Sequence, residues 1–274
     1  MSTVNRRALP GFSLGLGYSV FYLSVLVLIP LGACLLKASS LTVSEFWATV
    51  WTDRAVAAYK VTFGTALAAA AVNVVLGMIV GWTLVRYDFP FRRLLDALVD
   101  LPFALPTAVA GLVYATLYVK TGWLGQVLVP LGIEGAYSRL GIVLVLVFTG
   151  FPFVVRTVQP VLESLDAETE EAALILGASR FQTFRRVILP MLLPALVTGF
   201  ALAFARGVGE YGSVVFVSGN MPYHTEIAPY LIVTRLEEFK YREATAIAVV
   251  LLAVSFVLLI CINLLERWSK RYAA

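Results

Sequence analysis

The chain has 274 residues and a net charge of +4; 60% of its residues are hydrophobic and only 14% are charged. About a quarter of the residues in soluble domains are charged, so this composition excludes an ordinary soluble protein and indicates a membrane protein in contact with lipid. The positive charge is too small and too scattered for a nucleic-acid-binding surface, and we expect no nucleic-acid partner.

Six apolar segments are candidates for membrane-spanning helices. A bilayer core of about 30 Å requires roughly 20 apolar residues in a helix. The first segment follows Arg6 and Arg7, as in a signal peptide, but it is too long for one and lacks a clear cleavage site, so we expect a retained helix. We therefore predict an all-α polytopic fold, one membrane domain over 1–274, with spans at about 14–36, 61–85, 101–119, 140–156, 190–217 and 245–265.

Prolines interrupt three of these segments. Pro102 and Pro106 lie in the third span, Pro152 in the fourth, whose inner end the pattern does not fix, and Pro190 and Pro194 at the start of the fifth. We interpret them as kinks that help helices pack, and broken helices that line a pathway are the alternative.

Lys and Arg residues orient the chain in the membrane. They are modestly in excess on the side that would hold both termini and the loops 86–93 and 157–189. This bias predicts that both termini are cytoplasmic. Cys34 and Cys261 then lie near opposite faces and cannot pair, and we expect both to be buried apolar side chains.

The inner loop 157–189 is the longest hydrophilic segment on that side, and its pattern predicts a helix, a turn and a second helix. Asp166 is a candidate N-cap, acidic residues occupy the first turn, and Gly177 can end the first helix. A helix in the headgroup layer is one interpretation. Interfacial helices usually carry Lys and Arg, however, so this acidic, alanine-rich helix fits a protein partner better. The outer loop 218–244 could also hold a short helix.

Arg206 and Glu210 interrupt the fifth apolar segment. Four residues apart, they can pair on one face of a helix, about 24 Å from its start at Pro190. A charge so deep in the membrane is costly unless it faces protein or water. The pair is therefore either a structural ion pair or a charge beside the path of an anion.

Sequence motifs for catalysis are absent. The chain has no G-x-x-x-x-G-K-[ST] for nucleotide triphosphates, no G-x-S-x-G and no H-E-x-x-H. With one histidine, His224, it also lacks a histidine-based metal site. We expect no enzyme activity, no cofactor and no metal, so any ATP hydrolysis requires a separate subunit.

The segment EEAALILGASRFQTFRRVILP, residues 170–190, resembles the EAA loop of ABC-importer permeases. The matching pattern is Glu-Ala-Ala, three residues, Gly, nine residues, and Ile-x-Leu-Pro, with Val187 in place of the usual Ile. The resemblance implies that this loop contains a coupling helix that docks on the ATP-hydrolysing subunit. The implied contact residues are Glu170, Glu171, Ala172, Ala173, Gly177, Val187, Leu189 and Pro190.

Three further segments narrow the resemblance. DLPFALPTAVAGL (100–112), PFVVRTVQPVLE (152–163) and RGVGEYGSVVFVSGN (206–220) are similar to sulfate/thiosulfate permeases, the first in the form typical of T-type subunits. The resemblance implies the type I (MetI-like) importer permease fold, with a core over 57–266 and a coupling loop over 157–190. It also implies a bacterial inner membrane protein that moves sulfate or thiosulfate by alternating access.

The same resemblance implies the partners: a second, W-type permease, two copies of an ATP-binding subunit and a periplasmic sulfate/thiosulfate-binding protein. Alternatives remain open at this stage. They are a molybdate or tungstate permease, a proton-coupled secondary anion transporter with Arg206 and Glu210 as a relay, and a structural or assembly membrane protein.

Overall fold

The computed structural model describes the backbone of residues 12–273 and the side chains of that range other than Ser13, Ala167 and 265–273. Arg6 and Arg7 lie outside the described residues. Within these residues the regular structure is helical, with no strand, as the sequence predicts. Five helices are long and apolar enough to cross a membrane, and a sixth, Thr107–Tyr118, is apolar but shorter. This is the architecture of a multi-pass membrane protein.

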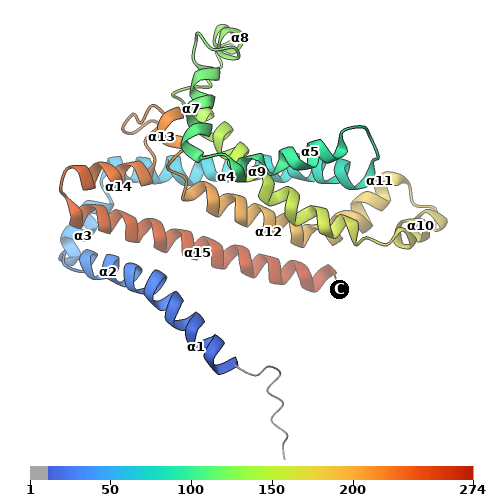
Figure 1. The fold of residues 1–274 in the computed structure, drawn as a ribbon, viewed down its shortest axis with the longest axis horizontal. Coiled ribbons are helices and arrows are strands. Elements are labelled where there is room, and N and C mark those ends of the chain that lie inside the picture. Colours follow the sequence, from blue (N-terminus) through green and yellow to red (C-terminus); the bar gives the residue numbers. More distant parts are fainter. Residues whose placement is uncertain (1–11, 274) are drawn as a thin grey trace, which may run out of the picture.

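The first predicted span is one continuous helix. It consists of α1 (Phe12–Leu23), a π-helical turn (Ser24–Leu28) and α2 (Ile29–Ala38). A short helix, α3 (Val43–Val50), follows it and begins with a capping box made by Thr42 and Glu45. In Figure 1, α1 diverges from the other helices, whereas α2 and α3 pack against α15.

α4 (Asp53–Arg86) is a helix of 34 residues that contains the predicted second span. It starts earlier than predicted because Thr52 caps it: the Thr52 hydroxyl accepts a hydrogen bond from the backbone N–H of Ala55. At 1.5 Å per residue the helix is about 51 Å long, which exceeds the bilayer core of about 30 Å. Both of its ends therefore extend beyond the apolar layer.

The third predicted span is interrupted, which corrects the single helix expected over 101–119. It consists of α6 (Leu101–Ala104) and α7 (Thr107–Tyr118), and α5 (Arg92–Val99) precedes it. The break falls at Leu105, which is extended, because the ring of Pro106 disfavours helical geometry in the residue before it. In Figure 1, α7 stands away from the long helices and carries α8 (Gly125–Leu128) and the 3₁₀ turn Val129–Leu131 at its far end.

The fourth span is longer than predicted. α9 (Arg139–Glu163) continues through Pro152 and Pro160, so its inner end lies beyond residue 156. The inner loop then forms α10 (Ala167–Ile175) and a second helix, as predicted. That second helix runs without a break from α11 (Arg180–Thr183) through the π-helical turn Phe184–Ile188 into α12.

The fifth span is shorter than predicted. α12 (Leu189–Val208) stops at Gly209, so Glu210 lies in the turn after the helix and not on the same helical face as Arg206. Two short helices follow, α13 (Val214–Val217) and α14 (Ala228–Glu237). α15 (Tyr241–Ala273) forms the last span, in which Cys261 is exposed, contrary to expectation.

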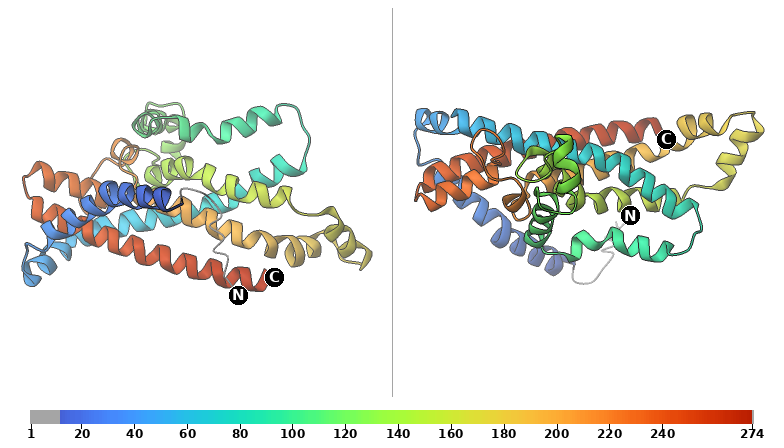
Figure 2. Two further views of the ribbon diagram at one scale, coloured as in Figure 1. Left: turned by 60° about the horizontal axis from the view of Figure 1, so that its bottom comes forward. Right: turned by 90° about the horizontal axis from the view of Figure 1, so that it is seen from above.

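The core is a bundle of α4, α9 and α12, which run side by side along the long axis in Figures 1 and 2. Small residues let these helices approach closely. At Gly199 of α12, an added Cβ would lie 2.5 Å from the Thr157 hydroxyl and 2.9 Å from the Val154 Cα. α15 covers α12 and α14.

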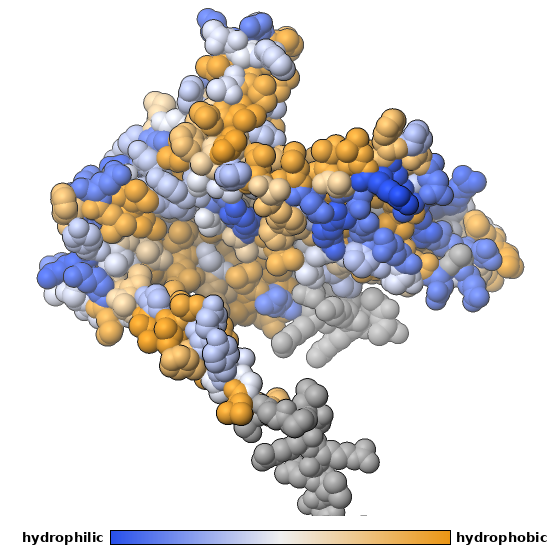
Figure 3. Space-filling view, in the orientation of Figure 1, coloured by the Kyte–Doolittle hydropathy of each residue, from blue (hydrophilic) through white to orange (hydrophobic). Residues whose placement is uncertain are grey.

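The loops gather at two ends of this bundle. One end, the α10 end, holds α5, α10 and α11; the opposite end, the α14 end, holds α3 and α14 (Figure 1). The segments predicted to share the inner side are thus together, as are the loops before α4 and after α13 predicted for the outer side. In Figure 3, hydrophilic residues cluster at the α10 end.

Candidate functional site

The first candidate region is the tip formed by α10 and the turn after it. Asp166 occupies the N-cap position with extended backbone, but its side chain makes no capping hydrogen bond, which corrects the expected cap. Gly177 has φ +80, a left-handed conformation that glycine adopts without strain, and so it ends the helix. The N–H of Ala178 donates to the Ala173 carbonyl at 3.0 Å across this turn. Ser179 then starts the second helix in a capping box with Gln182.

The tip exposes an apolar surface. Ile175 is 86% exposed and Leu176 88%, values that are unusual for large aliphatic side chains outside lipid or an interface. Beside them lies a hollow of about 350 Å³ between α10 and the second helix, lined by Ala173, Leu176, Gly177, Ala178, Gln182, Arg186 and Val187. The tip therefore has the shape and polarity of a docking surface for another protein.

Of the eight residues predicted to contact the ATPase subunit, five lie at the tip and two in the first turn of α12, and Glu170 pairs within the chain. Ala173, Gly177 and Val187 line the hollow, and Glu171 and Ala172 are exposed next to it. Leu189 and Pro190 lie in the first turn of α12. Their neighbour Ile188 is buried, so this turn anchors the second helix in the bundle.

Glu170 is the exception among the acidic residues of α10, because it pairs within the chain. Its carboxylate accepts a hydrogen bond from the Arg86 guanidinium at the end of α4. The Arg86 Cζ lies 5.3 Å from the centre of the Trp82 ring, in cation–π contact. Trp82 in turn meets Phe184 edge-on, with ring centres 5.7 Å apart.

Arg206 and Glu210 form the second candidate site, and the structure brings them together as an ion pair. Glu210 is 2% exposed, and it also accepts hydrogen bonds from the Ser213 N–H at 2.9 Å and the Ser213 hydroxyl at 3.0 Å. Gly111 of α7 packs on this turn, since a Cβ there would lie 2.1 Å from the Ser213 carbonyl oxygen. The pair therefore ties the turn after α12 to the end of that helix, and α7 packs on the turn, while the Arg206 side chain stays 35% exposed.

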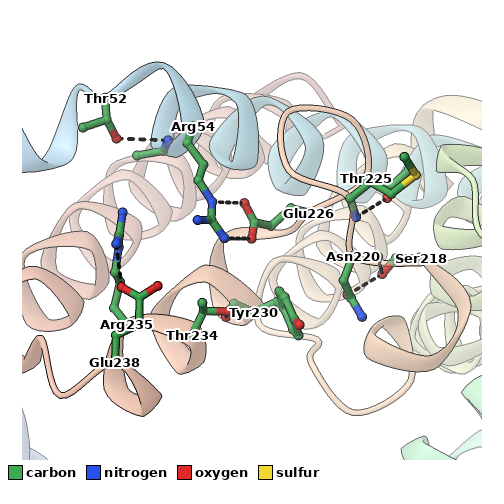
Figure 4. Close-up of polar contacts among 12 residues, drawn as sticks. Thr52, Arg54, Ser218, Asn220, Thr225, Glu226, Tyr230, Thr234, Arg235 and Glu238 are labelled. Carbon is green, nitrogen blue, oxygen red and sulfur yellow. Dashed lines mark hydrogen bonds and ion pairs between the residues drawn. The ribbon is translucent and has the colours of Figure 1, made fainter.

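Other ion pairs were not anticipated from the sequence. Arg54 of α4 makes a two-point contact with Glu226, at 2.8 Å and 2.6 Å (Figure 4). Glu226 is 1% exposed, so the pair fixes the loop before α14 to the start of α4. The partners are 172 residues apart, and no local pattern links them.

Arg156 of α9 forms a second unanticipated cluster, with two carboxylates of the α5 region. It donates to Asp96 at 2.6 Å and to both carboxylate oxygens of Asp100, at 2.9 Å and 2.6 Å. The spacing of Asp96 and Asp100, four residues apart, is the only signal that the sequence offered for a shared partner.

A surface hollow of about 490 Å³ lies at the α14 end, between α4, the start of α9 and the loop before α14. It is lined by Asp53, Lys60, Arg139 and Tyr223, among other residues. The Nε of Arg139 donates to the His224 carbonyl oxygen at 2.7 Å. Among the described residues, no group of His, Cys, Asp and Glu is arranged to hold a metal ion.

Residues 73–272 match the protein family described as the inner membrane component of binding-protein-dependent transport systems. The chain is 53% identical over 255 residues to the sulfate transport system permease protein CysT of Synechocystis sp., covering 93% of this chain and 89% of the relative. To the protein of the same name from Salmonella typhimurium it is 49% identical over 272 residues, covering 99% of this chain and 98% of the relative.

Solved structures share the fold. A bacterial alginate ABC transporter in complex with an alginate pentasaccharide-bound periplasmic protein matches with a TM-score of 0.75 and 18% identity, over 95% of this chain and 94% of that one. The MetNI methionine ABC transporter matches with a TM-score of 0.60 and 18% identity, over 84% of this chain and 99% of that one. The fold is therefore that of a type I ABC importer permease, as the resemblance implied.

Proposed function

We propose that this chain, which belongs to the family of binding-protein-dependent transport system inner membrane components, is the permease subunit of an ATP-driven importer of sulfate or thiosulfate. The substrate assignment rests on the 49–53% identity to relatives named as sulfate transport permeases, over 89–98% of their length. The fold supports the transport role independently, because the matched structures are ABC importers.

The tip of α10 is the proposed contact with the ATP-hydrolysing subunit. Its exposed aliphatic side chains and the hollow beside Gly177 support this assignment, because an exposed apolar surface of this kind is typical of a protein interaction site. The contact would comprise Glu171, Ala172, Ala173, Gly177 and Val187. We assign Glu170, Leu189 and Pro190 to holding the tip in place.

The remaining assembly follows from the same proposal. Two ATP-binding subunits would dock at the α10 end, which is then cytoplasmic, in the inner membrane, with both termini on that side. A second, W-type permease would cover exposed apolar residues of α7, such as Leu112 and Val113. A sulfate- or thiosulfate-loaded periplasmic binding protein would meet the α14 end.

Alternating access would work through the bundle. ATP binding draws the two ATPase subunits together and displaces the tips of α10, and the helices tied to them reorient the path between the two permeases. We place the Arg206–Glu210 pair in the structural role, because Glu210 is buried and its other bonds fix the turn on which α7 packs.

The test is uptake of radiolabelled sulfate by proteoliposomes that contain the chain with its partner subunits and binding protein. We expect uptake that requires internal ATP and the binding protein, with thiosulfate as a competitor. Competition by molybdate but not by thiosulfate would move the substrate to the molybdate class. Uptake driven by a proton gradient without ATP would refute the importer.

A further inference from the structure

The contact between Arg86 and Glu170 lies where three elements of the α10 end meet. Arg86 is the last residue of α4, Glu170 is in the middle of α10, and Phe184 begins the π-helical turn that leads into α12. Trp82 lies between Arg86 and Phe184 and contacts both. One continuous chain of side-chain contacts therefore connects α10 to α4 and α12.

This connection is particular to Glu170. The other described acidic side chains of α10, Glu168 and Glu171, are exposed and take part in no ion pair, whereas Glu170 is only 27% exposed. The backbone of α10 packs mainly against α11 and the π-helical turn. The Arg86 pair is thus the ion pair by which α10 reaches a helix that runs the whole length of the bundle.

The exposure of the pair distinguishes a mechanical role from a stabilising one. Both side chains are about a quarter exposed, 25% for Arg86 and 27% for Glu170, and solvent-accessible ion pairs of this kind contribute little to stability. Burial of the bundle core by α4, α9 and α12 does not depend on it. A weak ion pair between two helices can still determine which helices move with α10 when α10 is displaced.

We propose that Arg86 is a positioning residue for energy coupling: it holds Glu170 and Trp82 so that displacement of α10 moves α4 and α12 together. The inference rests on the proposed function. It also separates Glu170 from the surface offered to the ATPase subunit, since the Glu170 carboxylate faces a helix of its own chain. The charge requirement is then for opposite signs at positions 86 and 170, not for a carboxylate at 170.

The experiment compares variants in the reconstituted complex. Arg86→Gln and Glu170→Gln are each measured for subunit retention, ATP hydrolysis stimulated by the loaded binding protein, and sulfate transported per ATP hydrolysed. We expect normal subunit retention and a roughly 3- to 10-fold lower transport-to-ATP ratio in both. The charge swap Arg86→Glu with Glu170→Arg is expected to recover part of the ratio, and Arg86→Lys to fall between wild type and Arg86→Gln.

The matched control is Asp88→Asn. Asp88 forms an ion pair with Arg92 at 2.9 Å at the same end of the molecule, and that pair does not involve α10. We expect Asp88→Asn to transport with the wild-type ratio.

Three outcomes overturn the inference. They are a wild-type ratio in Arg86→Gln, loss of the ATPase subunit from that variant, and a defect in Glu170→Gln that Arg86→Gln does not share. The last would return Glu170 to the partner contact. If the wild-type complex itself shows no ATP-dependent uptake, the proposed function fails instead, so the two failures are distinct.

Discussion

Replacing Arg54 with methionine removes the partner of a carboxylate that is almost completely buried. Glu226 is 1% exposed and accepts both of its charged hydrogen bonds from Arg54, at 2.8 Å and 2.6 Å. Breaking a buried ion pair by removing one member costs about 3–5 kcal/mol. Because the Arg54 side chain is 25% exposed, we expect the lower limit, about 3 kcal/mol, for Arg54→Met.

The opposite substitution is expected to be milder. Glu226→Gln leaves an amide oxygen that still accepts a hydrogen bond, and Arg54 can turn its charge to water, so the loss is about 1–2 kcal/mol. The double variant Arg54→Met with Glu226→Leu is expected to recover most of the stability, because buried ion pairs are often replaced by apolar side chains at little cost. Arg54→Met is therefore the worst of the three.

The assay is the melting temperature of the assembled complex in lipid nanodiscs. At about 2–4 °C per kcal/mol for a chain of this size, Arg54→Met should lower it by about 6–12 °C and Glu226→Gln by about 2–8 °C. Lys240→Met is the control, since Lys240 pairs with Glu238 at 3.0 Å on the surface, where such pairs contribute about 0–1 kcal/mol. Equal melting of Arg54→Met and Lys240→Met would refute the reasoning.

Three other substitutions test the bundle, the tip and the turn after α12. Gly199→Ala places a Cβ 2.5 Å from the Thr157 hydroxyl and should cost about 1–3 kcal/mol by overpacking; an unchanged melting temperature would contradict the close approach of α12 to α9. Gly177→Ala forces φ +80 on a residue with a Cβ, at about 1–2 kcal/mol, and should weaken retention of the ATPase subunit on an affinity column, unlike Gly132→Ala, a matched left-handed glycine far from α10. Arg206→Ala should destabilise the complex by leaving Glu210 buried without a counter-charge; a stable complex that no longer transports would instead place Arg206 beside the anion path.

The long helices could be predicted from the sequence because each is a long apolar segment. α4, α9 and α15 carry this signal over most of their length, and the acidic first turn and the glycine of α10 mark its ends. What the apolar pattern missed is where helices stop within apolar sequence. Leu105 interrupts an apolar segment without a change in hydropathy, because Pro106 follows it. At Gly209 the helix ends in a glycine-rich turn, before Glu210.

The ion pairs between residues far apart in the sequence could not be predicted, for a different physical reason. A pair such as Arg206 and Glu210 is close in sequence, and its partners were found. Arg156 meets carboxylates 56 and 60 residues away, and only the packing of α5 on α9 determines that meeting. The sequence indicates that a buried or membrane-embedded charge needs a partner of opposite charge. Which residue that partner is depends on how the helices pack.

The two ion pairs of α4 that the sequence did not predict lie at opposite ends of the helix. Arg54, one residue after its start, holds Glu226 in the loop before α14, and Arg86, its last residue, holds Glu170 of α10. A 34-residue helix packed along α9 and α12 moves as a rod about 51 Å long, so its two ends cannot be displaced independently. On the coupling proposed above, the same helix that receives the displacement of α10 would carry it to the loop at the α14 end. In an importer whose binding protein docks at that end, the arrangement places both partners in contact with segments fixed to one helix.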